Sequence, residues 1–288
     1  MIFKTELKFH TTLRVGGEPH ILFVPKTLDE LIGFVKEYSS YAVLGGGSNV
    51  LANDEGLLYP VIKLSQLPRE IKKIEDTETH VLLRVSANIS KSKFLSYCLE
   101  HGLEGAEFLA GIPGNIGGGI AMNAGTSQGE FSDIVDQINV LKPNEEIVSL
   151  ANEEIGFSYR HAELPWGAVI ISAILKLKKG DEYEIKIKIK DILENRNKTQ
   201  PVKEANCGCI FKNPIVNGVR VSAGKLIDEV GLKGMQVGEA LISPMHGNFF
   251  VNVGNAKASD MILLIGLAQA KVYEKYKVML EKEVCIWL

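Results

Sequence analysis

The sequence predicts an α+β fold, because strand-like and helix-like segments are mixed along the chain without a regular βαβ rhythm. Two stretches show the contrast. "HVLLRVSA" alternates like a half-buried strand, whereas "SKSKFLSYCLEHG" has the apolar periodicity of a helix and ends at Gly102. At 288 residues the chain exceeds one average domain. We therefore expect two or three packed units of mixed secondary structure.

The first two thirds of the chain alternate between short apolar runs and amphipathic segments. Thr27 and Glu30 have the spacing of a capping box ahead of "LDELIGFVKEY", which predicts that a helix begins there. The segment 105–125 is dense in glycine, and we expect it to be mostly irregular. The short apolar runs predict strands at 21–25, 41–45, 57–64, 80–87, 134–141 and 168–177.

Residues 181–197 fit two patterns. Ile185, Ile187 and Ile189 alternate as in a strand, but Ile185, Ile189 and Ile192 also share a helical face. The segment contains no glycine or proline, which favours the helix, and we expect a domain boundary near it. Beyond it the sequence predicts helices at 223–230 and 259–276 and strands at 248–253 and 278–288.

Charge and composition exclude several classes of protein. The 32 Lys and Arg residues are balanced by 35 Asp and Glu residues, which argues against a nucleic-acid-coating surface. The charged N-terminal sequence predicts no signal peptide, and no window reaches the ~18 consecutive apolar residues of a spanning helix. Four cysteines in a chain of this length are not a disulfide framework. We therefore expect a cytoplasmic protein with reduced thiols and no membrane insertion.

The stretch "LGGGSN" at 44–49 places three glycines after an expected strand. Such a backbone can turn tightly and bring its N–H groups against a diphosphate, to which Ser48 and Asn49 would add donors. A plain glycine turn explains the pattern equally well. No helix opens directly behind it and no Gly-Lys-Ser/Thr follows, so it is neither a Rossmann fingerprint nor a P-loop.

A second glycine-rich stretch is "GAEFLAGIPGNIGGGIAMNAG" at 105–125. So much glycine costs conformational entropy when the chain folds. Apolar side chains such as Phe108, Ile112 and Ile120 are interleaved with the glycines, which a floppy loop would not need. We therefore predict that this segment lies against a large planar cofactor.

The stretch "NCGCIFKNP" at 206–214 contains Cys207 and Cys209, which could belong to a metal site, a disulfide, a reactive thiol or a buried strand. No second cysteine pair or histidine cluster stands at a usual metal-ligand spacing, so we expect no bound metal. Strain and a reducing compartment disfavour a disulfide. A reactive thiol and a buried structural cysteine both stay open.

In this order and spacing, "TTLRVGG", "LGGGSNVL", "GIPGNIGGGIAMNAG", "FSYRHAEL", "GCIFKNP" and "LEKEV" resemble the UDP-N-acetylenolpyruvoylglucosamine reductase family over nearly the whole chain. The resemblance implies an FAD-binding fold of the vanillyl-alcohol-oxidase (PCMH) type, with a C-terminal α+β substrate domain. The implied domains are 1–65 and 66–190 for FAD and 191–288 for the substrate. The chain resembles the short subtype that lacks an inserted tyrosine-bearing loop.

The family's activity implies a function. Its members are UDP-N-acetylmuramate dehydrogenases of peptidoglycan synthesis, in which NADPH reduces FAD and the flavin reduces the enolpyruvyl ether of UDP-N-acetylglucosamine. The implied partner is therefore a small sugar nucleotide, and we expect a monomer. The implied pyrophosphate contacts are Gly45, Gly46, Gly47, Ser48 and Asn49. The implied flavin-lining residues are Gly111, Gly114, Gly117, Gly118, Asn123 and Gly125.

Three residues match the family's catalytic positions. Arg160 would hold the enolate that hydride transfer creates, since a guanidinium offers a charged planar fork to a carboxylate. Glu283 would lie near the same intermediate, although Glu281 is expected on the same strand face. Cys209 replaces the family's proton-donating serine, and a thiol with a pKa of about 8.5 is mostly protonated near neutrality. The implied substrate contacts are Lys198, Asn213, His246 and Asn248.

The chain departs from the family at several positions, among them Lys282, which replaces a common proline, and Gly119, which replaces an alanine. Two other interpretations stay open. One is another flavoprotein oxidoreductase of the same fold, which would not need Arg160, Cys209 and Glu283 together. The other is a binding protein that has lost its chemistry. Three cysteines receive no role: Cys98, Cys207 and Cys285.

Overall fold

The computed structural model describes residues 1–143 and 146–288, which form two compact units. Unit 1 consists of residues 1–3, 22–46 and 59–195, and unit 2 of residues 4–21, 47–58 and 196–288. Each unit buries its own hydrophobic core. Segments of the two units therefore alternate along the chain.

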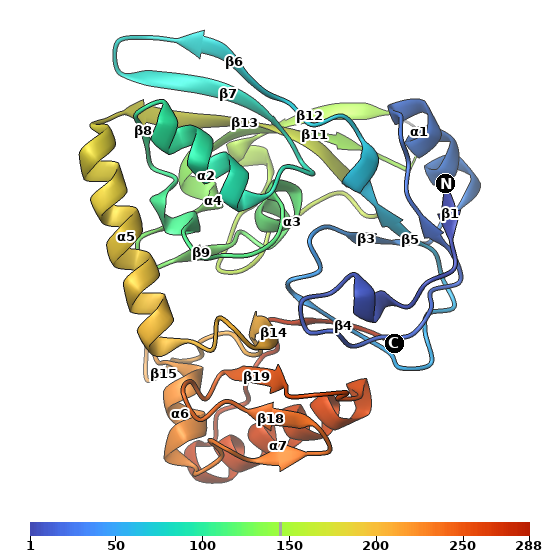
Figure 1. The fold of residues 1–288 in the computed structure, drawn as a ribbon, viewed down its shortest axis with the longest axis vertical. Helices are drawn as coiled ribbons and strands as arrows, with labels where there is room; N and C mark the ends of the chain where they lie inside the picture. Colours follow the sequence, from blue (N-terminus) through green and yellow to red (C-terminus); the bar gives the residue numbers. More distant parts are fainter. Residues whose placement is uncertain (144–145) are drawn as a thin grey trace. The chain divides into compact units, whose positions relative to one another are not determined.

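The larger sheet of unit 1 is antiparallel, with the strand order β12-β11-β13-β7-β6. Its central strand β13 pairs with β11 on one side and with β7 on the other (Figure 1). Ala173, Leu175 and Leu177 alternate along β13 and are buried, as the sequence pattern predicts. The strands are β6 (Ile71–Asp76), β7 (His80–Ser86), β8 (Leu103–Glu104), β11 (Val135–Leu141), β12 (Ile147–Ala151) and β13 (Val169–Lys179).

A smaller sheet of unit 1 has the strand order β1-β2-β5-β3. The helix α1 lies between β2 and β3 in the sequence. This helix begins where the capping box predicts: the Thr27 hydroxyl accepts from the Glu30 N–H at 3.2 Å. The Glu30 carboxylate accepts from the N–H of Lys26 instead of Thr27. These elements are β1 (Ile2–Phe3), β2 (Leu22–Phe23), α1 (Leu28–Glu37), β3 (Ala42–Leu44) and β5 (Val61–Lys63).

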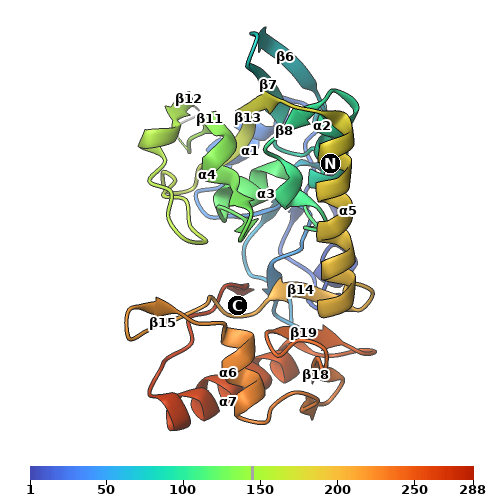
Figure 2. The ribbon, with the colours of Figure 1, turned by 90° about the vertical axis from the view of Figure 1, so that its left-hand side faces the viewer.

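The glycine-dense segment 105–125 is less irregular than its sequence predicts, because it contains a short helix, α3 (Ile116–Ala121). Ile116 and Ile120 lie one turn apart and are both fully buried, so this turn packs into the core. α3 lies against β7 and β13 (Figure 2). The other elements nearby are α2 (Lys91–Glu100), β9 (Gly125–Thr126), β10 (Gly129–Glu130) and α4 (Phe131–Ile134).

The ambiguous segment 181–197 is a helix, α5 (Glu182–Thr199), as the absence of breakers indicated. Ile185 and Ile192 lie on its buried face. The two compact units divide within this helix, between Asn195 and Arg196. Division of the first 190 residues into two FAD subdomains stays a prediction.

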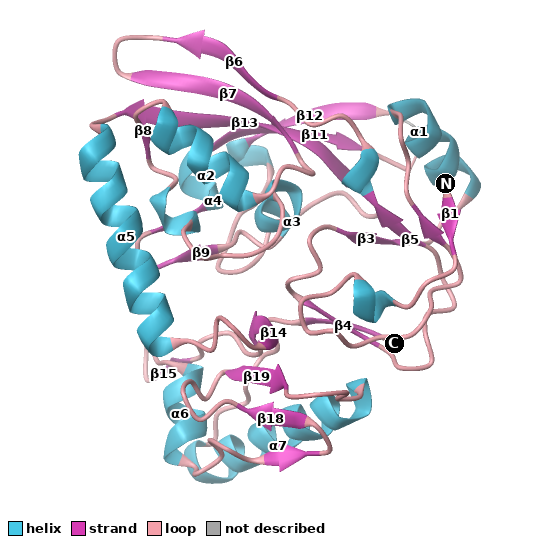
Figure 3. Cartoon of the chain, viewed as in Figure 1, coloured by secondary structure: helices cyan, strands magenta, loops and turns pink. Residues whose placement is uncertain are grey.

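Unit 2 contains an antiparallel sheet with the order β14-β19-β18-β17, and the long helix α7 packs on β17 and β18. Figure 3 shows how helix and strand are mixed in this unit. A separate pair joins β4 and β20 in parallel. The elements are β4 (Val50–Ala52), β14 (Ala205–Cys209), β15 (Ile215–Val216), β16 (Val219–Arg220), α6 (Ala223–Glu229), β17 (Gln236–Val237), β18 (Ala240–Ile242), β19 (Phe249–Asn252), α7 (Ala258–Tyr276) and β20 (Cys285–Trp287).

Polar contacts attach the N-terminal segments of unit 2 to its C-terminal part. The Asp54 carboxylate accepts from the N–H groups of Ala258 at 2.7 Å and Ser259 at 3.2 Å, and so caps the start of α7. The buried Asn252 amide donates to the carbonyl of Leu13 at 3.1 Å. Unit 2 is therefore assembled from segments about 200 residues apart in the chain.

The C-terminal strand is shorter than predicted. The expected strand at 278–288 reduces to β20, and within residues 281–284 only Lys282 forms an isolated bridge, to Phe211. The expectation that Glu281 and Glu283 share one strand face is therefore wrong.

No helix within residues 1–143 and 146–288 has the length and apolar character needed to cross a membrane.

Candidate functional site

The two glycine-rich stretches expected at the cofactor meet in unit 1. A Cβ placed on Gly46 would lie 2.6 Å from the Cα of Gly114, and one on Gly45 would lie 3.9 Å from the Cα of Gly118. Backbone therefore packs directly on backbone at Gly46, which a larger residue would prevent. Apart from its chain neighbours and the backbone of its own helix, no atom of the described residues lies within 4 Å of a Cβ placed on Gly118, so that position faces open space.

This arrangement fits a flat, charged cofactor such as FAD. Bare backbone at Gly45 and open space beside Gly118 allow a planar or phosphate group to approach peptide N–H groups closely. Gly111 and Gly114 have φ values of 73° and 101°, which glycine adopts without steric cost. Gly117 has a packing reason to be glycine, because its Cβ would lie 2.8 Å from the Cβ of Ala87.

Gly119 stands where the family commonly has alanine, and the structure explains the change. A Cβ at this position would overlap the ring of Phe131 and approach the Lys91 side chain at 2.8 Å. Phe131 is fully buried beneath α3, so its ring has no room to yield. Glycine at this position therefore avoids a steric clash within the core.

The remaining residues of the first glycine stretch belong to unit 2. Gly47 has a φ of 66°, and a Cβ there would overlap the carbonyl oxygen of His10. The Asn49 amide donates to the carbonyl of Glu283 at 3.0 Å. Gly47 and Asn49 thus have structural roles in unit 2, besides the contacts with pyrophosphate that the sequence predicts for them and for Ser48.

Arg160 is held against the second glycine stretch. Its guanidinium donates to the carbonyl of Gly125 at 2.6 Å, and its backbone has a φ of 57°. Asn123 is fully buried, and its amide donates to the carbonyl of Ser158 at 3.0 Å. The structure therefore brings three predicted site residues together in unit 1: Asn123, Gly125 and Arg160.

Cys209 is the last residue of β14 and follows a bulge. The register with β19 shifts between Asn206 and Cys209, and Gly208 has a φ of 79°. The bulge breaks the alternation of the strand. Cys207 is consequently buried, with 2% of its surface exposed, whereas Cys209 is partly exposed.

Thiols and a carboxylate gather around Cys207 in unit 2. Burial raises the pKa of Cys207 to about 12, and the charges of Cys209, Cys285 and Glu283 raise it as well. Burial, and then Glu283, also raises the pKa of Cys285. Cys207 and Cys285 therefore stay protonated near neutrality. Among residues 1–143 and 146–288, no three His, Cys, Asp or Glu side chains are placed to hold a metal ion.

The structure separates the two candidate glutamates. The Glu283 N–H donates to the carbonyl of Ile210 at 2.8 Å, and Ile210 is the residue that follows Cys209 in the chain. Glu281 instead forms an ion pair with Lys212 at 2.7 Å, and its side chain is 71% exposed. Glu283 therefore lies at the thiol cluster, whereas Glu281 points to solvent.

Arg196 is a candidate that sequence reasoning missed. Lys198 is exposed, but Arg196 is half-buried, and its charge interacts with Cys209. Burial lowers the pKa of Arg196, and in the described part of the chain its Nε is buried without a hydrogen-bond partner. Helical spacing could have found it, because Arg196 follows the buried Ile192 by one turn.

The other predicted substrate contacts take part in internal hydrogen bonds. The Asn213 side chain accepts from the N–H of Ala223 at 2.9 Å, where α6 begins. His246 accepts through Nδ1 from the N–H of Asn248 at 3.2 Å, and the Asn248 carboxamide bonds to Phe211. Direct contact of these residues, and of Lys198, with a substrate stays a prediction.

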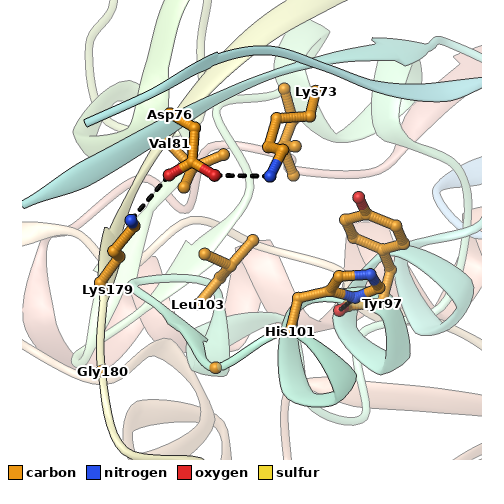
Figure 4. Close-up of a pocket in the computed structure, with 10 residues that line it drawn as sticks. Lys73, Asp76, Val81, Tyr97, His101, Leu103, Lys179 and Gly180 are labelled. Atoms are coloured by element: carbon orange, nitrogen blue, oxygen red, sulfur yellow. Dashed lines mark hydrogen bonds and ion pairs between the residues drawn. The ribbon is translucent and has the colours of Figure 1, made fainter. Parts of the chain in front are cut away.

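Unit 1 also has a cavity of about 340 Å³ beneath the β6–β7 hairpin, lined by no predicted site residue. Figure 4 shows Asp76 between two lysines, with ion pairs of 2.5 Å to Lys73 and 2.7 Å to Lys179. The bonds from Lys179 and Lys73 lower the pKa of Asp76 to about 2. The cavity's lysines are therefore paired with a carboxylate that stays ionised above strongly acidic pH.

Comparison with known families matches most of the chain. Residues 19–151 match the family described as "FAD binding domain", and residues 200–287 match the "UDP-N-acetylenolpyruvoylglucosamine reductase, C-terminal domain". The predicted α+β class with an FAD-binding fold is thereby confirmed.

Individual proteins resemble the chain over nearly its full length. The UDP-N-acetylenolpyruvoylglucosamine reductase of Rickettsia massiliae is 38% identical over 96% of this chain and 92% of its own. That of Clostridium tetani is 38% identical over 97% and 90%. The crystal structure of the Thermus caldophilus reductase superimposes with a TM-score of 0.85 at 37% identity, covering 100% of this chain and 99% of its own. The chain therefore belongs to the UDP-N-acetylenolpyruvoylglucosamine reductase family.

Proposed function

We propose that this protein uses NADPH to reduce the enolpyruvyl ether of UDP-N-acetylglucosamine to UDP-N-acetylmuramate, a step of peptidoglycan synthesis. Its near-full-length similarity to reductases of that name supports the substrate and the reaction. FAD, when bound, would supply the hydride chemistry that connects NADPH with the terminal alkene carbon of the substrate. The protein's own residues must bind the reactants, stabilise the resulting negative charge and supply one proton.

We assign cofactor binding in unit 1 to the backbone of the two glycine stretches. Gly45, Gly46 and Gly118 expose peptide groups without side chains, which suits close approach of phosphates or a flat ring. The match of residues 19–151 to an FAD-binding family supports this assignment. For Gly47, Ser48 and Asn49, which belong to unit 2, contact with the pyrophosphate stays a prediction from the sequence.

We assign charge stabilisation to Arg160. Hydride addition at the terminal carbon leaves an electron pair on the neighbouring carbon, delocalised onto the attached carboxylate. A guanidinium stays charged at working pH and pairs with a carboxylate through two parallel hydrogen bonds. The bond from Arg160 to the carbonyl of Gly125 supports the role, because it fixes the direction of a long side chain. Glu283 is assigned to the same intermediate.

We assign the proton to Cys209. The S–H bond of Cys209 breaks as a C–H bond forms at the charged carbon, and solvent later restores the thiol proton. The leaving thiolate needs stabilisation, and the charge of Arg196 beside Cys209 supplies it. Cys207 is unsuited because it is buried, with 2% of its surface exposed, whereas Cys209 is partly exposed.

One observation carries the proposal beyond family membership: Cys209 and Glu283 are tied to the same residue. Ile210 follows Cys209 directly, and its carbonyl accepts from the Glu283 N–H at 2.8 Å. A proton donor and a carboxylate are thus held in fixed register within unit 2, which the addition of one proton from one side requires.

Anaerobic rapid mixing tests the proposal. NADPH is added to the FAD-loaded protein, and then enolpyruvyl UDP-N-acetylglucosamine, while the flavin absorbance is followed. We expect bleaching and then prompt recovery. Bleaching without recovery would instead indicate another flavoprotein oxidoreductase of the same fold. Failure to bind FAD at all would overturn the proposal at its first step.

A further inference from the structure

The Asn248 side chain forms hydrogen bonds with the peptide segment that follows Cys209. Its Oδ1 accepts from the N–H of Phe211 at 2.9 Å, and its Nδ2 donates to the carbonyl of the same residue at 2.8 Å. The main-chain carbonyl of Asn248 accepts from the N–H of Ile210 at 2.9 Å. One residue therefore bonds three of the four backbone polar groups of Ile210 and Phe211, the two residues that follow Cys209.

The opposite side of this segment is also held. The carbonyl of Ile210 accepts from the Glu283 N–H at 2.8 Å, and the N–H of Lys212 donates to the carbonyl of Glu281 at 2.9 Å. Backbone groups on both sides of Cys209 are thus fixed: the bulge at Gly208 precedes it, and these bonds follow it. We call residues 210–212, the segment that these hydrogen bonds hold on both sides, the backbone clamp.

We propose that Asn248 is a positioning residue for proton delivery, acting through the backbone clamp on Cys209. This inference rests on the proposed function, in which Cys209 is the proton donor. It is an alternative to the direct contact with the nucleotide that the sequence predicts. Asn248 is 1% exposed, and its carboxamide bonds Phe211, which favours an indirect effect on a substrate.

The short cysteine side chain explains why the backbone matters. The sulfur atom lies one bond beyond Cβ and has a single rotatable bond, so the main chain sets its position. Proton transfer requires donor and acceptor within hydrogen-bond reach, and a displacement of about 1 Å can slow a reaction on the order of a hundredfold. A residue that fixes the peptide after Cys209 therefore affects the rate without touching the substrate.

The chain offers a matched control for Asn248→Ala. Asn252 is the last residue of β19, the strand that begins directly after Asn248. It is 7% exposed and also bonds backbone groups, donating to Leu13 at 3.1 Å and accepting from Gly254 at 3.0 Å. None of these bonds involves the backbone clamp. Asn252→Ala thus removes comparable buried hydrogen bonds but leaves the surroundings of Cys209 intact.

The main measurement separates the two half-reactions by anaerobic rapid mixing. We expect both alanine variants to be reduced by NADPH at the wild-type rate. Asn248→Ala should then be reoxidised by the enolpyruvyl substrate about tenfold or more slowly, whereas Asn252→Ala should be reoxidised normally. Equal reoxidation rates in the two variants would overturn the inference.

A second readout requires neither flavin nor substrate. Alkylation of Cys209 by iodoacetamide is followed by mass spectrometry over a range of pH, with melting midpoints recorded alongside. We expect Asn248→Ala to change the rate and pH profile of labelling at Cys209 severalfold, and Asn252→Ala to leave both unchanged. If Asn248→Ala does not fold, Asn248→Asp, which retains the acceptor for Phe211, replaces it with the same expected split.

Cys209→Ala distinguishes failure of the inference from failure of the proposed function. If Cys209→Ala is reoxidised as fast as the wild type, the proposed proton donor is wrong, and the inference fails with it. If Cys209→Ala is slow but Asn248→Ala matches Asn252→Ala, only the positioning role is wrong.

Discussion

Two buried asparagines, Asn123 in unit 1 and Asn248 in unit 2, hold the segments that carry Arg160 and Cys209. Asn123 connects different parts of its unit: its amide donates to the Glu130 carboxylate at 2.9 Å and to the carbonyl of Ser158 at 3.0 Å. In Asn248, both polar atoms of the side chain form hydrogen bonds with one residue, Phe211.

The difference follows from the side chains that are held. Arg160 is long, and its tip has a hydrogen bond of its own to Gly125. Cys209 is short, so its sulfur position depends on the main chain that Asn248 and Glu283 hold. The comparison teaches that a long functional side chain can be oriented at its tip, whereas a short one must be oriented through its backbone.

The largest effect is expected at Cys209. Cys209→Ala removes the proposed general acid and should slow flavin reoxidation by the substrate about 10²- to 10⁴-fold, with reduction by NADPH nearly unchanged. Cys209→Ser retains a proton donor at the same position and should keep substantial activity. Rapid-mixing absorbance measures both half-reactions. An equal loss in the two half-reactions would mean that the residue is structural.

Arg160 should show the next largest effect. Arg160→Ala should slow reoxidation about 10²- to 10³-fold, because the developing anion loses its charged partner. Arg160→Lys keeps the charge but loses the planar fork, and should recover only part of the rate. Single-turnover reoxidation measures both variants. An unchanged rate in Arg160→Ala would remove the residue from the mechanism.

Much of the fold and part of the candidate site could be predicted from the sequence. Its motifs predicted the family. The capping box predicted α1, the absence of glycine and proline favoured a helix at α5, a helix was predicted at 259–276 where α7 lies, and apolar alternation predicted central strands such as β7. The cysteine at position 209 was recognised through motif order, not through any local pattern.

Other features could not be predicted from local patterns. The bulge at Gly208 separates Cys207 from Cys209, although strand periodicity places alternate residues on one face. Glu281 and Glu283 differ because residues 281–284 meet residues 210–212, and such long-range contacts leave no trace in local sequence. The bonds of Asn248 could not be read from the local sequence for the same reason, because its partner Phe211 lies 37 residues away.

A smaller effect concerns pH and the support of Asn248. Burial, and secondarily the charge of Lys233, lowers the pKa of His246, whose neutral Nδ1 accepts from the Asn248 N–H. As the pH falls, the His246 imidazole is therefore protonated in the unfolded chain before it is protonated in the folded protein. The stabilisation of the fold by neutral His246 is complete above pH about 6.5 and is lost as the pH falls below that value. Each unit of pKa shift corresponds to about 1.4 kcal/mol.

The melting midpoint of the wild type should consequently fall between pH 7.5 and about 5, and more steeply than that of His246→Ala. The Asp76 carboxylate, whose pKa is lowered to about 2, does not interfere, because its contribution is lost only below about pH 4. Parallel midpoint curves for the wild type and His246→Ala would show that this imidazole does not titrate with folding.

The smallest effect is expected at Glu281. Its ion pair with Lys212 is largely exposed, with 71% of the Glu281 side chain accessible, so Glu281→Gln should change the free energy of unfolding by less than about 1 kcal/mol. Glu281→Gln should also leave reoxidation unchanged, whereas Glu283→Gln should slow it. The two variants alter neighbouring carboxylates identically, and the backbone bonds of residues 281 and 283 remain in both. A slow Glu281→Gln with a normal Glu283→Gln would reverse the assignment and place the carboxylate on the solvent side of the backbone clamp.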